Sequence, residues 1–245
     1  KSALVRKLLD IPGFAHYPYF FLQMSVETFD DEKRRILSPN SSAIKDRIET
    51  LRLFSLKGFY TVMRIDPIIF GYTDNYDEIL QLLHAAKEIG VKHVITSTTR
   101  FDTQGIQSVR ERLMKEGLDK TYQKVKESYM YEGGWLRVPR RRREEFHRKL
   151  KTETEKHGMT YAVCMELDWS YDSGSIPHCE GSPNSYMMLR TKEGNFKPIC
   201  HADCLRSCPN KEEPPCGAPE LAVEYPYRET TLSCRTTQTT QLRLR

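Results

Sequence analysis

Cysteine is missing from the first 163 residues of this 245-residue chain, and all seven cysteines follow in the last third. Disulfide frameworks are typical of short secreted chains with an even number of cysteines, so this pattern argues against one. No apolar run approaches the roughly 18 residues that a transmembrane helix needs. Glycine and proline, with 13 residues each, are too scarce for a collagen-like or low-complexity chain. These absences favour a globular protein without a membrane partner.

The chain also lacks an initiating methionine, because it begins at Lys1, and no signal-peptide pattern follows. We therefore expect a cytoplasmic protein, and a piece of a longer polypeptide whose N-terminal part is missing. The length suits one large domain, or one domain with a small appendage. The net charge of +5 permits a nucleic-acid partner without requiring one.

Strand-like and helix-like patterns alternate along the first two-thirds of the chain. Apolar runs predict strands at 20–26, 59–65, 91–96 and 159–165, and residue spacing predicts helices at 1–10, 30–36, 43–57, 76–89, 103–131 and 140–157. Short connections indicate parallel βα units with right-handed crossovers. The strands are too few for a closed barrel of about eight. The pattern therefore predicts an α/β fold, specifically a partial, incomplete TIM-like β/α barrel.

We expect three regions along the sequence. Residues 1–160 would form the later βα units of the partial barrel, and residues 161–218 would form a Cys-rich metal or cluster segment. Residues 219–245 are rich in Thr, Gln and Arg and have few apolar side chains, which predicts a disordered tail.

Polar side chains follow three of the predicted strands. Ser25 and Glu27 follow the first strand, Arg64 and Asp66 the second, and Ser97 the third. Ligands of parallel β/α folds bind at the C-terminal ends of strands, so these residues are candidates for a shared binding face. The alternative is that each set only caps a helix or is solvated in a loop, but three sets in register favour binding.

These strand ends resemble the radical S-adenosylmethionine superfamily, in particular its spore photoproduct lyase-like branch. The resemblance spans roughly residues 16–217 and is carried by residues 23–28 (Gln-Met-Ser-Val-Glu-Thr), 35–40 (Arg-Ile-Leu-Ser-Pro-Asn), 64–69 (Arg-Ile-Asp-Pro-Ile-Ile) and 94–97 (Val-Ile-Thr-Ser). The sequence departs from the branch at Ser38, where an acid usually stands. The resemblance implies a barrel of the radical S-adenosylmethionine type.

The resemblance also implies a cofactor and its ligands. S-adenosylmethionine would lie across the strand ends, with Ser25 near its ribose or amino-acid part, Arg64 paired with its carboxylate and Ser97 near the adenosyl group. Glu27 and Asp66 would complete this cofactor-binding set. An arginine and a carboxylate form a bidentate, charge-assisted pair, which suits the role implied for Arg64.

The implied activity is lyase-like radical chemistry, in which a 4Fe-4S cluster cleaves the cofactor to a 5′-deoxyadenosyl radical. The substrate is unknown, and nucleic acid is one candidate. The family's cluster loop, Cys-x3-Cys-x2-Cys, does not occur in this sequence. We therefore expect the loop to precede Lys1 in the longer polypeptide, and the chain alone to be inactive.

The C-terminal cysteines form a second candidate site. Cys200, Cys204, Cys208 and Cys216 are closely spaced, and Cys164 and Cys179 precede them. Four thiolates at such spacing can bind zinc or a second iron–sulfur cluster. Free thiols or disulfides are the alternatives.

A run of four arginines, Arg140 to Arg143, opens one predicted helix. Cations at this end oppose the helix dipole, so a phosphate-binding role for nucleic acid is the functional interpretation. The alternative is a solvated charged face. The run also supports a second hypothesis for the whole chain, a non-catalytic nucleic-acid-binding module that zinc or a cluster stabilises.

Overall fold

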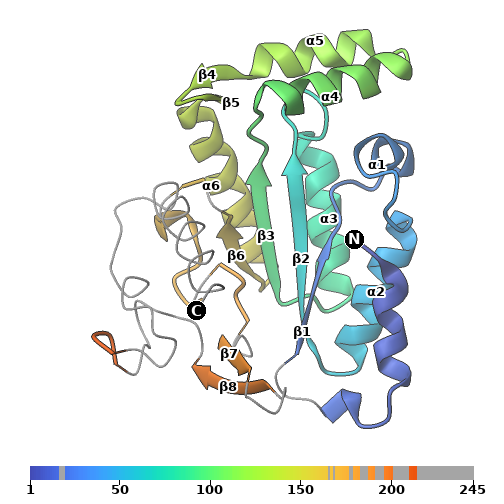
Figure 1. Cartoon of the computed structure of the whole chain (residues 1–245), viewed down its shortest axis with the longest axis vertical. Coiled ribbons are helices and arrows are strands. Elements are labelled where there is room, and N and C mark those ends of the chain that lie inside the picture. Colours follow the sequence, from blue (N-terminus) through green and yellow to red (C-terminus); the bar gives the residue numbers. More distant parts are fainter. Residues whose placement is uncertain are drawn as a thin grey trace.

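The computed structural model describes residues 1–16, 20–164, 166–167, 169–176, 179–182 and 210–213, and the backbone alone of 187–190 and 196–200. Its central element is a parallel sheet with the strand order β1-β2-β3-β6 (Figure 1). The strands are β1 (Phe21–Ser25), β2 (Tyr60–Ile68), β3 (His93–Thr98) and β6 (Thr160–Val163). The predicted α/β class with parallel βα units is confirmed.

Three crossover helices connect these strands, and they pack along one face of the sheet (Figure 1). They are α2 (Ile44–Leu56), α3 (Tyr76–Glu88) and α6 (Arg140–Lys156). The strands contribute Met63, Ile65 and Val94 to the large apolar core beneath the helices, while Val62 and Ile95 form a smaller cluster. Side chains alternate along a strand, so the smaller cluster marks the opposite face of the sheet.

The remaining elements surround this unit. They are the 3-10 helices η1 (Ala3–Asp10), η2 (Phe14–His16) and η3 (Trp169–Tyr171), the helices α1 (Asp31–Leu37), α4 (Thr103–Lys115) and α5 (Asp119–Ser128), and the strands β4 (Met130–Glu132), β5 (Trp135–Arg137), β7 (Met187–Arg190) and β8 (Phe196–Cys200). β4 and β5 form an antiparallel hairpin, as do β7 and β8.

Two helix predictions need correction. The first segment, residues 3–10, is a 3-10 helix, and the single helical stretch expected at 103–131 is divided into α4, α5 and β4. Gly117 adopts φ +68° between α4 and α5, a left-handed conformation that ends a helix. Gly133 and Gly134 also have positive φ and form the turn of the β4–β5 hairpin.

Side-chain caps fix where several helices begin. The Asn75 side chain accepts a hydrogen bond from the backbone N of Glu78 at the start of α3, at 3.1 Å. Asp30 binds the backbone N of Glu32 and Lys33 at the start of α1. Such caps satisfy N–H groups that have no partner within the helix. The caps therefore fix where α1 and α3 begin after β1 and β2.

Candidate active site

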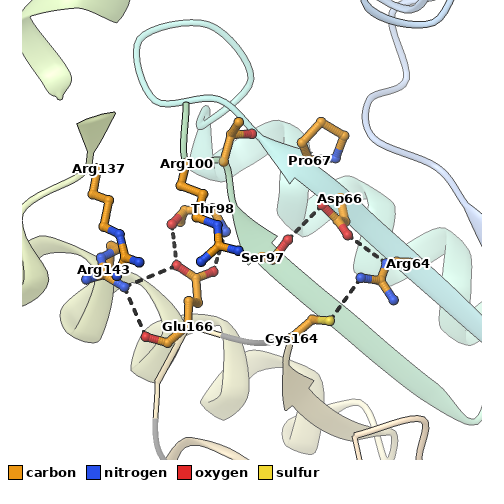
Figure 2. Close-up of a pocket in the computed structure, with 11 residues that line it drawn as sticks. Arg64, Asp66, Pro67, Ser97, Thr98, Arg100, Arg137, Arg143, Cys164 and Glu166 are labelled. Atoms are coloured by element: carbon orange, nitrogen blue, oxygen red, sulfur yellow. Dashed lines mark hydrogen bonds and ion pairs between the residues drawn. The ribbon is translucent and has the colours of Figure 1, made fainter. Parts of the chain in front are cut away.

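A cavity of about 270 Å³ opens at the C-terminal ends of β2, β3 and β6. Its walls come from the last residues of β2 and β3, from residues that follow β3 and β6, from β5 and from the first turn of α6 (Figure 2). The lining residues are Arg64, Asp66, Pro67, Ser97, Thr98, Thr99, Arg100, Arg137, Arg143, Cys164 and Glu166. The cavity therefore lies where parallel β/α folds bind their ligands.

Strand register explains why the predicted residues converge. Ser25 lies opposite Arg64, and Arg64 lies opposite Ile95. Ser97 is two residues beyond Ile95 and so shares its face of the sheet. Cys164, directly after β6, packs with Ile95 in the smaller apolar cluster. The side chains of Arg64, Ser97 and Cys164 consequently meet on the face opposite the helices.

Hydrogen bonds connect the residues at one end of the cavity into an Arg64 cluster, which comprises Arg64, Asp66, Ser97 and Cys164. Nε of Arg64 donates to Oδ2 of Asp66 at 2.6 Å, and Oγ of Ser97 donates to Oδ1 at 2.7 Å. Nη2 of Arg64 lies 3.0 Å from Sγ of Cys164 (Figure 2). Asp66 thus holds both Arg64 and Ser97, as a shared acceptor in the half-buried site.

The other two predicted cofactor ligands lie outside the cavity lining. Glu27 is buried, and its Oε2 accepts a hydrogen bond from Nη1 of Arg47 at 2.8 Å. The same Arg47 nitrogen donates to the backbone oxygen of Ser25 at 2.8 Å. Lys1 also approaches Glu27, at 3.3 Å. Glu27 therefore forms an ion pair with Arg47 of α2, and Arg47 also binds the end of β1.

Sequence reasoning did not identify Glu166, which lines the opposite end of the cavity. This carboxylate accepts hydrogen bonds from both N and Oγ1 of Thr98, and lies 3.0 Å from Nε2 of His147 and 3.5 Å from Nη1 of Arg143. Burial alone would raise the pKa of Glu166, but His147 and the Thr98 hydrogen bonds hold it below its usual value. Applying the strand-end rule to the fourth strand would have found Glu166, two residues after Cys164.

A buried chain of polar groups continues beneath Glu166. Nδ1 of His147 lies 2.7 Å from the hydroxyl of Tyr161, and that hydroxyl lies 2.5 Å from Oγ1 of Thr96. All three side chains are fully or almost fully buried. The network links α6, β3 and β6 below the cavity. Through His147 it holds Glu166 in position.

The predicted arginine run divides into two parts. Arg143 is buried and donates hydrogen bonds to the backbone oxygens of Val138 and Glu166, at 2.9 and 3.0 Å. Arg140, Arg141 and Arg142 are exposed. Nucleic-acid binding by these exposed residues stays a prediction, whereas Arg143 belongs to the cavity.

The structure describes only part of the predicted cysteine site. Cys164 is a buried thiol beside Arg64, and Cys179 is half-buried. The side chain of Cys200 and all of Cys204, Cys208 and Cys216 lie outside the described residues. Within the described part, no group of three or more His, Cys, Asp or Glu residues could hold a metal ion. Metal binding by these cysteines therefore stays a prediction.

Cys164 is expected to react slowly with iodoacetamide at neutral pH. Burial raises the pKa of the Cys164 thiol, although Arg64 opposes that effect, and the thiolate is the reactive species. Brief alkylation followed by peptide mass spectrometry should label Cys164 far more slowly in the folded protein than in urea-unfolded protein. Equal labelling rates in folded and unfolded protein would contradict the burial of Cys164.

No helix in the described part of the chain is long and apolar enough to cross a membrane.

Comparisons with known proteins bear on this site. No family model matches the chain. The chain is 28% identical over 153 residues to a protein of Pseudomonas phage M6 named "Radical SAM Nalpha-GlyT isomerase". That match covers 61% of this chain but only 31% of the relative, so the chain corresponds to about a third of the relative's length.

A solved structure is also similar, namely "Spore photoproduct lyase complexed with dinucleoside spore photoproduct". The TM-score is 0.45 at 18% sequence identity, and the match covers 66% of this chain and 48% of the other. The sequence similarity to the phage protein agrees with the resemblance to radical S-adenosylmethionine proteins that the strand-end motifs carry.

Proposed function

We propose that this chain is the cofactor- and substrate-binding part of a radical S-adenosylmethionine enzyme, and that S-adenosylmethionine binds at the Arg64 cluster. The observation that carries the proposal is the convergence of Arg64, Asp66 and Ser97 in one cavity at the strand ends. The sequence relationship to a radical S-adenosylmethionine isomerase supports it. The substrate is not identified, and nucleic acid is one candidate.

The chemistry of the Arg64 cluster fits the cofactor. S-adenosylmethionine has a carboxylate, an ammonium group and two ribose hydroxyls. Arg64 is suited to the carboxylate, and Asp66 and Ser97 to the ammonium or hydroxyl groups. Oδ2 of Asp66 accepts a hydrogen bond from Nε of Arg64 at 2.6 Å, so the guanidinium is already oriented in the absence of the cofactor. Preorganised charges of this kind bind ligands with little reorganisation.

Ser25 and Glu27 take different roles in this proposal. Ser25 lies opposite Arg64 in the sheet and remains a candidate contact to the cofactor. Glu27 acts as a positioning residue, because it holds Arg47, and Arg47 holds the backbone oxygen of Ser25. The pair therefore fixes the end of β1 next to the cluster.

The described residues do not fit the 4Fe-4S cluster that such enzymes use. The sequence has no Cys-x3-Cys-x2-Cys loop, and the described part holds no metal-binding group of three or more side chains. We assign no step of the reaction to a cluster on these residues. Bound at such a cluster elsewhere in the complete protein, S-adenosylmethionine would supply radical chemistry. Zinc or a second cluster at Cys200 to Cys216 remains part of the proposal.

We also propose that the parallel sheet is part of a β/α barrel. The crossover helices cover one face of the sheet (Figure 1), and the side chains of Arg64 and Ser97 lie on the other. A barrel has this arrangement, with helices outside and binding residues at the strand ends. The barrel region would include β6, which begins at Thr160, and the Cys-rich region would follow it.

Replacing Arg64 by glutamine should weaken binding of S-adenosylmethionine by 10- to 100-fold, since a hydrogen-bonded charge contributes about 1.5–3 kcal/mol. Equilibrium dialysis of radiolabelled cofactor against the anaerobically reconstituted, complete gene product would measure this. Arg110→Gln is the matched control, because Arg110 is exposed on α4. Equal affinity in wild type and Arg64→Gln would reject the proposed cofactor site.

A further inference from the structure

The end of the cavity opposite the Arg64 cluster is lined by arginines from three different elements. Arg100 follows β3, Arg137 ends β5, and Arg143 lies in the first turn of α6. Figure 2 shows their side chains gathered around Glu166. The described residues at this end therefore bring three guanidinium groups together with one carboxylate. We call Arg100, Arg137 and Arg143 the arginine triplet.

Among the described residues, the carboxylate at this end belongs to Glu166 and is already engaged. Glu166 accepts two hydrogen bonds from Thr98 and one from His147, besides its contact with Arg143. Glu166 is therefore held in place by Thr98 and His147, and Arg143 is held beside Glu166. The buried position of Glu166 and Arg143 makes this arrangement rigid.

Arg100 is held in a different way. Its guanidinium carbon lies 4.7 Å from the ring centroid of Trp135, and its side chain is exposed. A cation over an aromatic face is positioned by the ring while its N–H groups can still bind another group. Trp135 belongs to β5, the same strand as Arg137. The hairpin therefore positions Arg137 directly and Arg100 through its contact with Trp135.

Thr99 provides a second observation that points to a ligand. It lines the cavity between β3 and Arg100, and its Oγ1 is buried. Within the described part of the structure, this hydroxyl has no hydrogen-bond partner. Buried hydroxyls are almost always hydrogen-bonded, so a bound molecule would satisfy this one.

We propose that the arginine triplet and Thr99 bind a phosphate group of the substrate. A phosphate carries up to about two negative charges, and its tetrahedral oxygens accept hydrogen bonds from several directions at once. Guanidinium groups that arrive from β5, α6 and the loop after β3 match that geometry. A planar carboxylate is satisfied by one arginine, which is the role proposed for Arg64 at the other end of the cavity.

This inference rests on the proposed function, because binding of the cofactor at the Arg64 cluster leaves the arginine triplet for the substrate. The cavity then places a phosphorylated substrate directly beside the cofactor. The exposed Arg140, Arg141 and Arg142 lie on the same helix as Arg143 and are not needed for this contact.

Inorganic phosphate is the probe for this site, and its binding to the chain is followed by the width of its ³¹P resonance. Acetate is added as a competitor, and we expect phosphate to bind more tightly than acetate. Arg100→Gln and Arg137→Gln should each weaken phosphate binding by about tenfold. Arg110→Gln, an exposed change on α4, should leave phosphate binding unaltered. Thermal unfolding of each variant tests whether it is folded. Arg100 is exposed, so Arg100→Gln is expected to disturb the fold least.

Two results would overturn the proposal: acetate binding as tightly as phosphate, or Arg110→Gln weakening phosphate binding as much as Arg100→Gln does. Competition by thymidine monophosphate and by a single-stranded oligothymidylate then distinguishes a phosphate monoester from a nucleic-acid diester, and competition by either supports the phosphate site. Arg64→Gln should retain phosphate binding. Phosphate binding without any binding of S-adenosylmethionine would count against the proposed cofactor site alone.

Discussion

Methionine in place of Arg47 is expected to lower the free energy of unfolding by about 3–5 kcal/mol. The side chains of Arg47 and Glu27 are both fully buried, and their ion pair is 2.8 Å long. Removing the guanidinium leaves the buried carboxylate without its buried partner, and the partly exposed Lys1, 3.3 Å away, compensates it only in part. Urea denaturation followed by circular dichroism would measure the change.

The neighbouring ion pair on α2 supplies the control. Arg52 and Glu49 are also in contact, at 2.7 Å, but both side chains are exposed. Exposed pairs contribute little, so Arg52→Met should change the free energy of unfolding far less. The double variant Glu27→Leu with Arg47→Met should recover much of the stability that Arg47→Met loses. Equal losses in Arg47→Met and Arg52→Met would show that the pair is not buried in solution.

Glutamine in place of Glu166 should lower the free energy of unfolding by about 3 kcal/mol at pH 7, because Arg143 and His147 then face a neutral group in a buried site. The pKa of Glu166 lies below the usual 4.5 in the folded protein. A carboxyl with a lowered folded-state pKa stabilises the protein above its unfolded-state pKa. That stabilisation is lost as the pH falls through the folded-state value.

The difference between wild type and Glu166→Gln should therefore be constant near neutral pH and shrink as the pH falls below 4.5. Urea denaturation across this range gives the profile. Glu145→Gln is the matched control, since Glu145 is an exposed residue of the same helix that carries His147. A difference that grows toward acid pH would mean that Glu166 is protonated in the folded protein.

The strands and their ligand-binding edge could be predicted because each follows from local patterns. Apolar runs separated by helical segments favour a parallel sheet, and the strand-end rule then selects Arg64, Asp66 and Ser97. The sheet register brings these three together as expected. Whether the sheet closes into a barrel depends on strands that local patterns in these residues do not specify.

Side-chain direction outside the strands was the part that sequence could not supply. Glu27 follows β1 just as Asp66 lies near the end of β2, but an arginine of α2 turns it away from the cavity. Arg143 is buried although its three predecessors are exposed, because α6 packs with that side toward the sheet. Arg137 reaches the cavity only because Gly133 and Gly134 turn the chain into a hairpin. Each depends on contacts between elements distant in sequence.

Cofactor cleavage tests the central claim most directly. The complete gene product would be reconstituted anaerobically with iron and sulfide, reduced, and incubated with S-adenosylmethionine. We predict that wild type forms 5′-deoxyadenosine and methionine in equal amounts, and that Arg64→Gln forms them at least tenfold more slowly while keeping its iron content. Cluster-loaded wild-type protein that forms no 5′-deoxyadenosine would contradict the account.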